Sequence, residues 1–269
     1  MSVITVSRGT FSGGKILAEC ISQQLGYRCI DRDVIVERAA ASGVSQEELR
    51  NALLKPPGLL ERFGHKKYIY LALIQAALAE EVRTGKAVYH GNAGHLLLKG
   101  AGPVLRTRII APLEFRIRMC QERLKLSRFE AVAYIEKVDQ DRRKWTQYLY
   151  GVDWGDPALY DLVLNLEFIE IETACNIIAA AAKEKRFELT PERQAAMNDF
   201  ALGSRVKAQL ASDPATSHLE VDAACRAGEV SIRGRITDLT EIDEVRRVAG
   251  ALPGVTTVNL EELTLPTRT

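Results

Sequence analysis

The chain has 269 residues, of which 46% are hydrophobic and 26% are charged, and this composition excludes a disordered protein. Its formal net charge of +1 excludes a global field for gathering nucleic acid, so nucleic acid is not an expected partner. The five cysteines are widely spaced without a C-x-x-C pair, which argues against a disulfide framework or a zinc site. No apolar run approaches the ~20 residues of a membrane span, so we expect a cytoplasmic protein without a transmembrane segment.

The first predicted elements are a strand, a glycine-rich loop and a helix. A short apolar run starts at Val3, and apolar residues recur at helical spacing from Ile16 to Leu25. Between them, four residues separate Gly9 from Gly14, and Lys15 follows, which is the spacing of a phosphate-binding P-loop. Glycines let backbone N–H groups converge on phosphate oxygens, and the helix N-terminus and the lysine add positive charge. A glycine-rich turn that merely joins strand to helix is the alternative.

In the commonest P-loop a serine or threonine follows the lysine and holds magnesium, but Ile16 stands there in this chain. The candidate nucleotide-binding residues are Gly9, Thr10, Phe11, Ser12, Gly13, Gly14, Lys15 and Ile16.

A second strand, Tyr27 to Ile30, ends at the charged sequence Asp31-Arg32-Asp33. A charged cluster at the end of a strand next to the P-loop strand is well placed to bind substrate. A helix N-cap by Asp31 or Asp33 is at least as good an explanation for either aspartate alone. Residues 34 to 85 are predicted to be helical: one helix near 34–41, one after a capping box that starts at Ser45, and one over about 66–84, with Pro56-Pro57-Gly58 before the last. Such an insertion fits either a hinged substrate-binding flap or helices packed for stability.

A third strand, Ala87 to Tyr89, leads into a glycine-containing loop over residues 90–95. Its histidines, His90 and His95, have no acidic or cysteine neighbour in the loop, which favours ordinary loop histidines over metal ligands, and no metal ligand is predicted. A fourth strand is predicted at 107–111, followed by helices from residues 113 and 127. The second of these helices carries Arg142 and Arg143. Arginines near a phosphate site neutralise charge in phosphoryl transfer, but a solvated helix face has the same pattern.

The fifth strand is predicted at Leu162 to Asn165, with a helix through about residue 185. Five strands alternating with helices predict an α/β fold: a P-loop NTPase-type parallel sheet, flanked by helices, with ligand at the carboxyl ends of its strands. A charged stretch at 184–192 predicts a boundary. Behind it, helices at 197–210 and 239–251 and strands at 218–223, 229–233 and 256–263 predict a small α+β module.

Several stretches resemble known families. ITVSRGTFSGGK, GYRCIDRDVI, IIAPLEFRIR, EKVDQDRR and YGVDWGDPALYDLVLN, spanning residues 3 to about 185, resemble the cytidylate kinase-like family of P-loop nucleoside monophosphate kinases. The stretches DFALGSRVKAQLASDP, GEVSIRGRITD and ALPGVTTV, over about 197–264, resemble a BON domain, which implies a lipid or protein partner. The resemblance implies a kinase domain at 1–187, with an acceptor-binding insertion at about 34–85 and a lid at about 127–150, and a BON-like domain at 195–269.

The resemblance also implies roles for residues. Gly9 to Lys15 would hold the phosphates of ATP, Lys15, Arg142 and Arg143 would be catalytic, and Mg²⁺ would be held mainly through phosphates and water. Asp31, Arg32 and Asn92 would lie near the acceptor nucleotide. Cytidylate kinases read like D-G-R-D in the loop after the third strand, whereas this chain has His90, Asn92 and Ala93 there, so specificity for cytidine monophosphate does not carry over.

Three functional hypotheses follow. The first is a kinase that transfers the γ-phosphoryl group of ATP to a nucleoside monophosphate or a related small acceptor. The second is a catalytically impaired, nucleotide-binding regulatory protein whose tail binds a partner or lipid. The third is that the tail mediates homo-oligomerisation.

Overall fold

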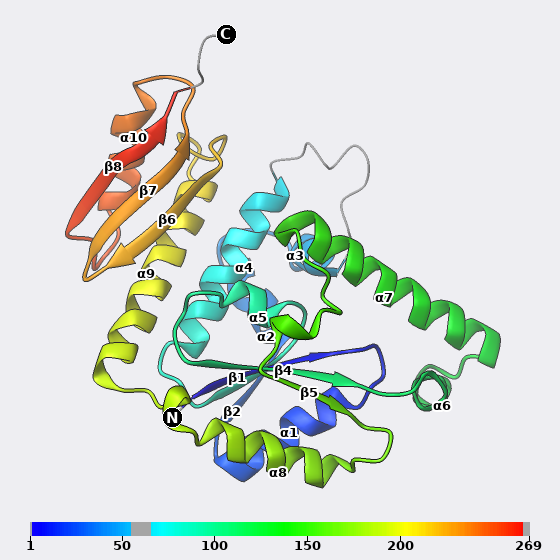
Figure 1. Ribbon diagram of the computed structural model, residues 1–269. Coiled ribbons are helices and arrows are strands. Elements are labelled where there is room, and N and C mark those ends of the chain that lie inside the picture. Colours follow the sequence, from blue (N-terminus) through cyan, green and yellow to red (C-terminus); the bar gives the residue numbers. More distant parts are fainter. Residues whose placement is uncertain (1, 55–65, 266–269) are drawn as a thin grey trace.

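The computed structural model describes residues 2–54 and 66–265. They form a five-stranded sheet in the order β2-β3-β1-β4-β5 and a three-stranded sheet in the order β6-β7-β8, which we call the large and the small sheet (Figure 1). All neighbouring strands of the large sheet are parallel. The predicted fold class, a parallel α/β sheet followed by a small α+β unit, is confirmed.

The strands of the large sheet are β1 (Val3–Arg8), β2 (Arg28–Asp31), β3 (Ala87–His90), β4 (Val104–Ile110) and β5 (Leu162–Asn165). The fourth strand was predicted over 107–111 and in fact begins three residues earlier, where Val104 pairs with Val3. Arg106 interrupts the apolar run there, but its guanidinium binds Asp161 through two hydrogen bonds of 2.7 and 3.1 Å, so it fits in the strand.

Helices cover both faces of the large sheet (Figure 1). On one face, α1 (Gly14–Leu25) and α8 (Ile171–Ala182) bury Leu17, Ile21 and Ile178 against β1 and β4. On the other face lie α2 (Arg32–Ala40), α4 (Lys66–Val82) and α5 (Gly94–Leu97), together with α3 (Gln46–Leu54). The predicted helices of the insertion are therefore present. The predicted break at Pro56-Pro57-Gly58 lies outside the described residues.

After β4, the chain forms α6 (Leu113–Leu124) and the long α7 (Arg128–Tyr150). The start of α7 is set by a capping box in which Ser127 and Glu130 bond each other's backbone N–H groups. A separate small core, with Ile117 and Ile135 at its centre, joins the two helices. They therefore form one packed unit, which we call the arm, beside the carboxyl ends of the strands.

The small sheet contains β6 (Val221–Arg226), β7 (Glu229–Arg235) and β8 (Thr257–Thr264), with α10 (Glu241–Gly250) between the last two strands. β7 pairs antiparallel with β6 and parallel with β8. The first strand was predicted at 218–223 and lies about three residues later, because Leu219 is buried in a turn before the strand. Short 3₁₀ helices also occur at Pro157–Leu159 and Lys185–Phe187.

The helix α9 (Pro191–Ser212) belongs to both cores. It was predicted to begin near 197, but Thr190 caps it and Pro191 occupies its first turn. Met197 is buried in the core on the α4 side of the large sheet, whereas Val206 and Leu210 are buried under the small sheet. The Tyr68 hydroxyl on α4 also donates a hydrogen bond to the Val221 carbonyl. The predicted boundary at 184–192 thus precedes a helix that the two units share.

No helix in the described ranges combines the length and apolarity needed to cross a bilayer.

Candidate functional site

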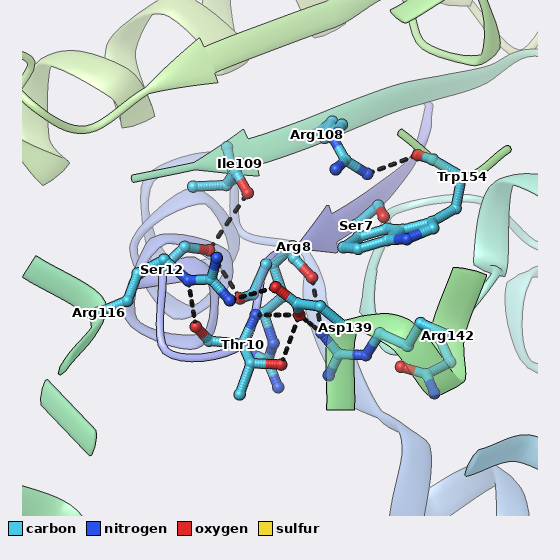
Figure 2. A network of polar contacts seen from close by, with 12 residues as sticks. Ser7, Arg8, Thr10, Ser12, Arg108, Ile109, Arg116, Asp139, Arg142 and Trp154 are labelled. Carbon is cyan, nitrogen blue, oxygen red and sulfur yellow. Dashed lines mark hydrogen bonds and ion pairs between the residues drawn. The ribbon is translucent and has the colours of Figure 1, made fainter. Parts of the chain in front are cut away.

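The glycine loop, residues 9–13, joins β1 to α1 at the carboxyl edge of the large sheet. Ser12 is fully buried inside it, and its hydroxyl is within hydrogen-bonding distance of the carbonyls of Gly9 (2.9 Å) and Ile109 (3.2 Å). The Gly9 N–H also donates to the Ile109 carbonyl at 3.1 Å. The loop is therefore fastened to the end of β4 (Figure 2).

Two glycines are required by the local geometry. Gly13 has a φ of 83°, in the left-handed region that favours glycine. A Cβ atom at Gly14 would lie 2.8 Å from Cδ of Arg8, because the Arg8 side chain runs across the start of α1. Phe11 also has a left-handed φ, 61°, and its ring centroid lies 6.1 Å from that of Tyr134 on α7. The conformation of the loop thus depends partly on contacts with Arg8 and Tyr134.

The arm closes onto this loop. The Asp139 carboxylate on α7 accepts hydrogen bonds from the Thr10 hydroxyl at 2.9 Å and the Thr10 N–H at 3.3 Å. Arg116 on α6 donates to the Thr10 carbonyl at 2.7 Å and pairs with Asp139. Arg142, one helical turn after Asp139, donates to the Arg8 carbonyl at 3.0 Å. These contacts form one network (Figure 2).

The two predicted lid arginines point to different places, as adjacent residues on a helix do. Arg142 is directed into the network, and its pKa is lowered to about 10 by burial, which outweighs the attraction of Asp139. Arg143 is 65% exposed, with Nε 3.5 Å from the Asp153 carboxylate. The structure therefore brings Arg142 to the glycine loop and leaves Arg143 on the outer side of α7.

Lys15 and Ile16 lie on the outer surface at the start of α1. The Lys15 side chain is 45% exposed, with Nζ 3.7 Å from the Glu19 carboxylate. Exposed ion pairs of this kind contribute little free energy, so Lys15 can leave Glu19 for a stronger anion. Ile16 is 53% exposed and has no oxygen with which to bind a metal ion.

The predicted acceptor residues have separate environments. Asp31 caps α2 by accepting from the Val34 N–H at 3.0 Å, so the capping alternative is confirmed. Asn92 donates to the Leu53 carbonyl at 3.2 Å and thereby ties its loop to the end of α3. The Arg32 guanidinium lies 3.8 Å from Asp33, while its buried Nε has no hydrogen-bond partner. Of the three, Arg32 has the most free hydrogen-bonding capacity.

The loop at 90–95 is shaped by Tyr89, which is fully buried. A Cβ atom would lie 2.3 Å from the Tyr89 hydroxyl if placed at Gly91, and 2.4 Å from its ring if placed at Gly94. His90 and His95 are buried. Burial lowers the pKa of His90 to about 4 and that of His95 to about 3, with nearby arginines adding to both shifts. Both histidines are therefore neutral at pH 7. Within residues 2–54 and 66–265, no group of three metal-ligating side chains occurs.

Sequence reasoning missed Trp154. Its ring centroid lies 3.9 Å from Cζ of Arg108 on β4 and 5.8 Å from Cζ of Arg142. Its carbonyl accepts from Arg108 at 2.5 Å and from the Tyr160 hydroxyl at 2.8 Å. Trp154 thus links the sheet to the arginine of α7 (Figure 2). The sequence signal that could have identified Trp154 is its place in the stretch YGVDWGDP, which resembles the cytidylate kinase-like family.

Arg8, Arg116 and Asp139 were not among the predicted site residues either, although each contacts the glycine loop. Arg8, Asn92, Arg142 and Trp154 line a cavity of about 20 Å³, room for about one water molecule. Little room is therefore left among these four side chains. A larger cleft of about 1750 Å³ lies between α4, α9 and β6, away from the glycine loop.

The chain matches two family models: the cytidylate kinase-like family over residues 3–167 and the BON domain over residues 198–264. The cytidylate kinase of Pyrococcus horikoshii is 28% identical over 181 residues, covering 66% of this chain and 87% of that protein. The cytidylate kinase of Methanocaldococcus jannaschii is 29% identical over 182 residues, covering 66% and 96%.

Among solved structures, an uncharacterized protein from Eubacterium ventriosum aligns with a TM-score of 0.53 at 15% identity, covering 67% of this chain and 97% of that one. This likeness concerns the fold alone. Because the first family model matches more than half of the residues, the chain belongs to the cytidylate kinase-like family and carries a BON domain behind the family domain.

Proposed function

We propose that the protein is an ATP-dependent phosphotransferase of the nucleoside monophosphate kinase type. It would transfer the γ-phosphoryl group of ATP to a nucleotide or a related small acceptor. The observation that carries this proposal is the glycine loop with Lys15 beside it and the arm packed over it, from which Arg142 donates to the carbonyl of Arg8, the residue before the loop. Residues 1–187 would form the kinase domain and residues 195–269 the BON-like domain.

In this proposal the donor phosphates lie at the N-terminus of α1, on the backbone N–H groups of residues 9–15 other than those of Gly9 and Ser12, which already donate to the carbonyls of Ile109 and Gly9. That end of a helix favours anions, and the loop is held in position by the buried hydroxyl of Ser12. The Lys15 ammonium leaves its exposed partner Glu19 and follows the γ-phosphoryl group, where it neutralises developing charge. The Thr10 N–H, bound by Asp139 in this structure, becomes available to phosphate when α7 shifts.

The acceptor would lie between the glycine loop, Arg32 and Arg142. An acceptor oxygen forms the new bond to the γ-phosphorus, and the bond from that phosphorus to the bridging oxygen of ADP breaks, with the electron pair leaving on ADP. No covalent enzyme intermediate is needed, so catalysis comes from positioning and from charge stabilisation. Arg143 would join only if α7 rotates, since it faces Asp153.

Membership of a kinase family implies the use of Mg²⁺, but the described side chains do not form a binding site for this ion. Ile16 has no oxygen ligand, and the described part of the chain has no cluster of three acidic, cysteine or histidine side chains. Magnesium would arrive bound to the phosphates of ATP and remain held mainly through them and through water.

The test is a coupled assay of the full chain with ATP and each of CMP, dCMP, UMP and AMP. We expect turnover with at least one acceptor, and a loss of roughly 100-fold or more in kcat for Lys15→Ala. Lys144→Ala, an exposed lysine on the outer side of α7, is the matched control and should retain turnover. Absence of phosphorylation of every acceptor by pure, folded protein would overturn the proposal.

A second candidate is a nucleotide-binding regulatory protein whose BON domain binds a protein partner or lipid. It is favoured by the small volume of the cavity, about 20 Å³, and by Asn92, whose side-chain amide already donates a hydrogen bond to the Leu53 carbonyl. Calorimetry that detects ATP binding, without transfer to any acceptor, would support it.

Solution mass measured with and without residues 190–269 tests the separate hypothesis that the tail makes a homo-oligomer.

A further inference from the structure

Trp154 is buried between two arginines that come from different elements. Its ring centroid lies 3.9 Å from Cζ of Arg108 on β4 and 5.8 Å from Cζ of Arg142 on α7, and Figure 2 shows the ring between them. Both distances lie within the ~6 Å over which an aromatic face attracts a cation, and tryptophan attracts most strongly. The indole ring thus stabilises two positive charges at once.

Arg108 fixes Trp154 to the large sheet. Its side chain is buried, and in the described ranges it forms no ion pair with a carboxylate. Its Nη1 donates to the Trp154 carbonyl at 2.5 Å, and the Tyr160 hydroxyl donates to the same carbonyl at 2.8 Å. Arg108 therefore holds both the backbone and the ring of Trp154, and the position of the ring is set from the side of the sheet.

Arg142 has few other contacts that could fix its guanidinium. Among the described residues this group makes one hydrogen bond, to the Arg8 carbonyl at 3.0 Å, and its buried Nε has no hydrogen-bond partner. The carboxylate of Asp139 lies 3.7 Å from it and already accepts from Thr10. The face of the Trp154 ring is therefore the contact that can set the plane of the Arg142 guanidinium next to the glycine loop.

The surroundings of Trp154 differ from those of a tryptophan buried for packing alone. It joins none of the apolar clusters in residues 2–54 and 66–265, whereas Trp145 lies in the core on the α4 side. Its indole N–H is buried without a hydrogen-bond partner, a cost in free energy that phenylalanine or leucine would avoid. What tryptophan adds at this position is the face of its ring, which attracts cations more strongly than that of other side chains.

We propose that Trp154 is a positioning residue of the phosphotransferase: anchored by Arg108, it lies against Arg142 and holds that guanidinium at the glycine loop. This role rests on the proposed function and extends it to a residue outside the loop and outside α7. Because Arg142 neutralises charge that develops during transfer, losing its position lowers kcat and leaves the affinity for ATP unchanged.

The first test is a double-mutant cycle on the full chain, with an acceptor that the coupled assay shows to be phosphorylated. Trp154→Leu should lower kcat by roughly 10- to 30-fold, the effect of a desolvated cation–π contact, and Trp154→Phe, which keeps a ring, by roughly 2- to 5-fold. ATP affinity from calorimetry should change less than about twofold. In an Arg142→Met background, Trp154→Leu should lower kcat by no more than about a further twofold, since the two residues act as a unit.

Phe129→Leu, which removes a ring that is 84% exposed on α7, is the control and should keep the wild-type kcat. Losses in Trp154→Leu and Arg142→Met that multiply would overturn the inference. So would a fall in ATP affinity as large as the fall in kcat, because a merely structural tryptophan would affect both.

A measurement without turnover separates this role from the proposed function. In heteronuclear NMR spectra of the arginine side chains, the Nε–H resonance of Arg142 should shift when Trp154→Leu removes the ring current, whereas that of Arg143, on the outer side of α7, should stay in place. If no acceptor is phosphorylated, the kinase proposal fails and this shift decides; an unmoved Arg142 resonance would refute the contact. If Trp154→Leu does not fold, Trp154→Phe replaces it in both measurements.

Discussion

Tyr89 occupies the space beneath the loop at 90–95, and this has a consequence at Gly94. A methyl group there would lie 2.4 Å from the tyrosine ring and 3.3 Å from Thr5, with no room on either side. We expect Gly94→Ala to lower the free energy of unfolding by about 1–3 kcal/mol, the usual cost of overpacking a core. Urea unfolding measures it. Gly250→Ala, with its nearest atom 3.9 Å away at the end of α10, should cost nothing. Equal stability of the two variants would contradict this packing.

His90 and His95 make stability depend on pH. Their folded-state pKa values, about 4 and about 3, lie below the ordinary value of 6.5. The unfolded chain therefore binds protons first as the pH falls. The stability contributed by the neutral histidines is complete above pH 6.5 and is lost below it, down to about pH 4 for His90 and pH 3 for His95. The maximal slope is about 1.4 kcal/mol per pH unit per histidine.

His95→Leu tests this, because it removes one of the two titrating groups together with ring nitrogens that have no partner. We expect its free energy of unfolding, measured in urea between pH 7.5 and 4.5, to fall less steeply with decreasing pH than that of the wild type. A parallel pair of curves would show that His95 is not the titrating group.

At the scale of elements, Asp139 is the main link between α7 and the glycine loop. Its carboxylate binds Thr10 and lies beside Arg116 and Arg142, so Asp139→Asn leaves two arginines without their charge partner. Because these side chains are only partly buried, we expect a modest loss of about 1–3 kcal/mol in the free energy of unfolding. Amide hydrogen exchange at residues 9–13 should also become faster. Glu136→Gln, exposed on the same helix, is the control; protection unchanged in Asp139→Asn would argue against the link.

The sequence predicted those elements whose signals are local. The spacing of Gly9, Gly14 and Lys15 located the strand, loop and first helix, and the helix predicted from Ser127 is α7, which begins at Arg128. The predicted start of β4 was wrong because Arg106 is neutralised by Asp161, 55 positions later in the chain. The roles of Arg116 and Asp139 were missed for the same reason, since each meets Thr10 across more than 100 residues. Contacts between distant segments leave no periodic pattern.

At the scale of the whole molecule, α9 gives the two sheets a common core. Met197 is 2% exposed on the α4 side, so Met197→Ala should lower the stability of the large sheet by about 2–4 kcal/mol. The measurement is tryptophan fluorescence in urea, because both tryptophans, Trp145 and Trp154, lie outside the small sheet and α9. Gln209→Ala, exposed on the same helix, is the control. An unchanged fluorescence midpoint would mean that α9 is no part of the larger core.

A tilt of α9 is amplified along its length. Its 22 residues extend about 33 Å, so a tilt of about 5° at one end displaces the other by about 3 Å. One end bears the small sheet and the other runs along α4, which packs against α2, the helix that begins with Arg32 (Figure 1). A force on the small sheet that tilts α9 would therefore also displace α4 and α2, the helix whose first residue is the proposed acceptor residue Arg32.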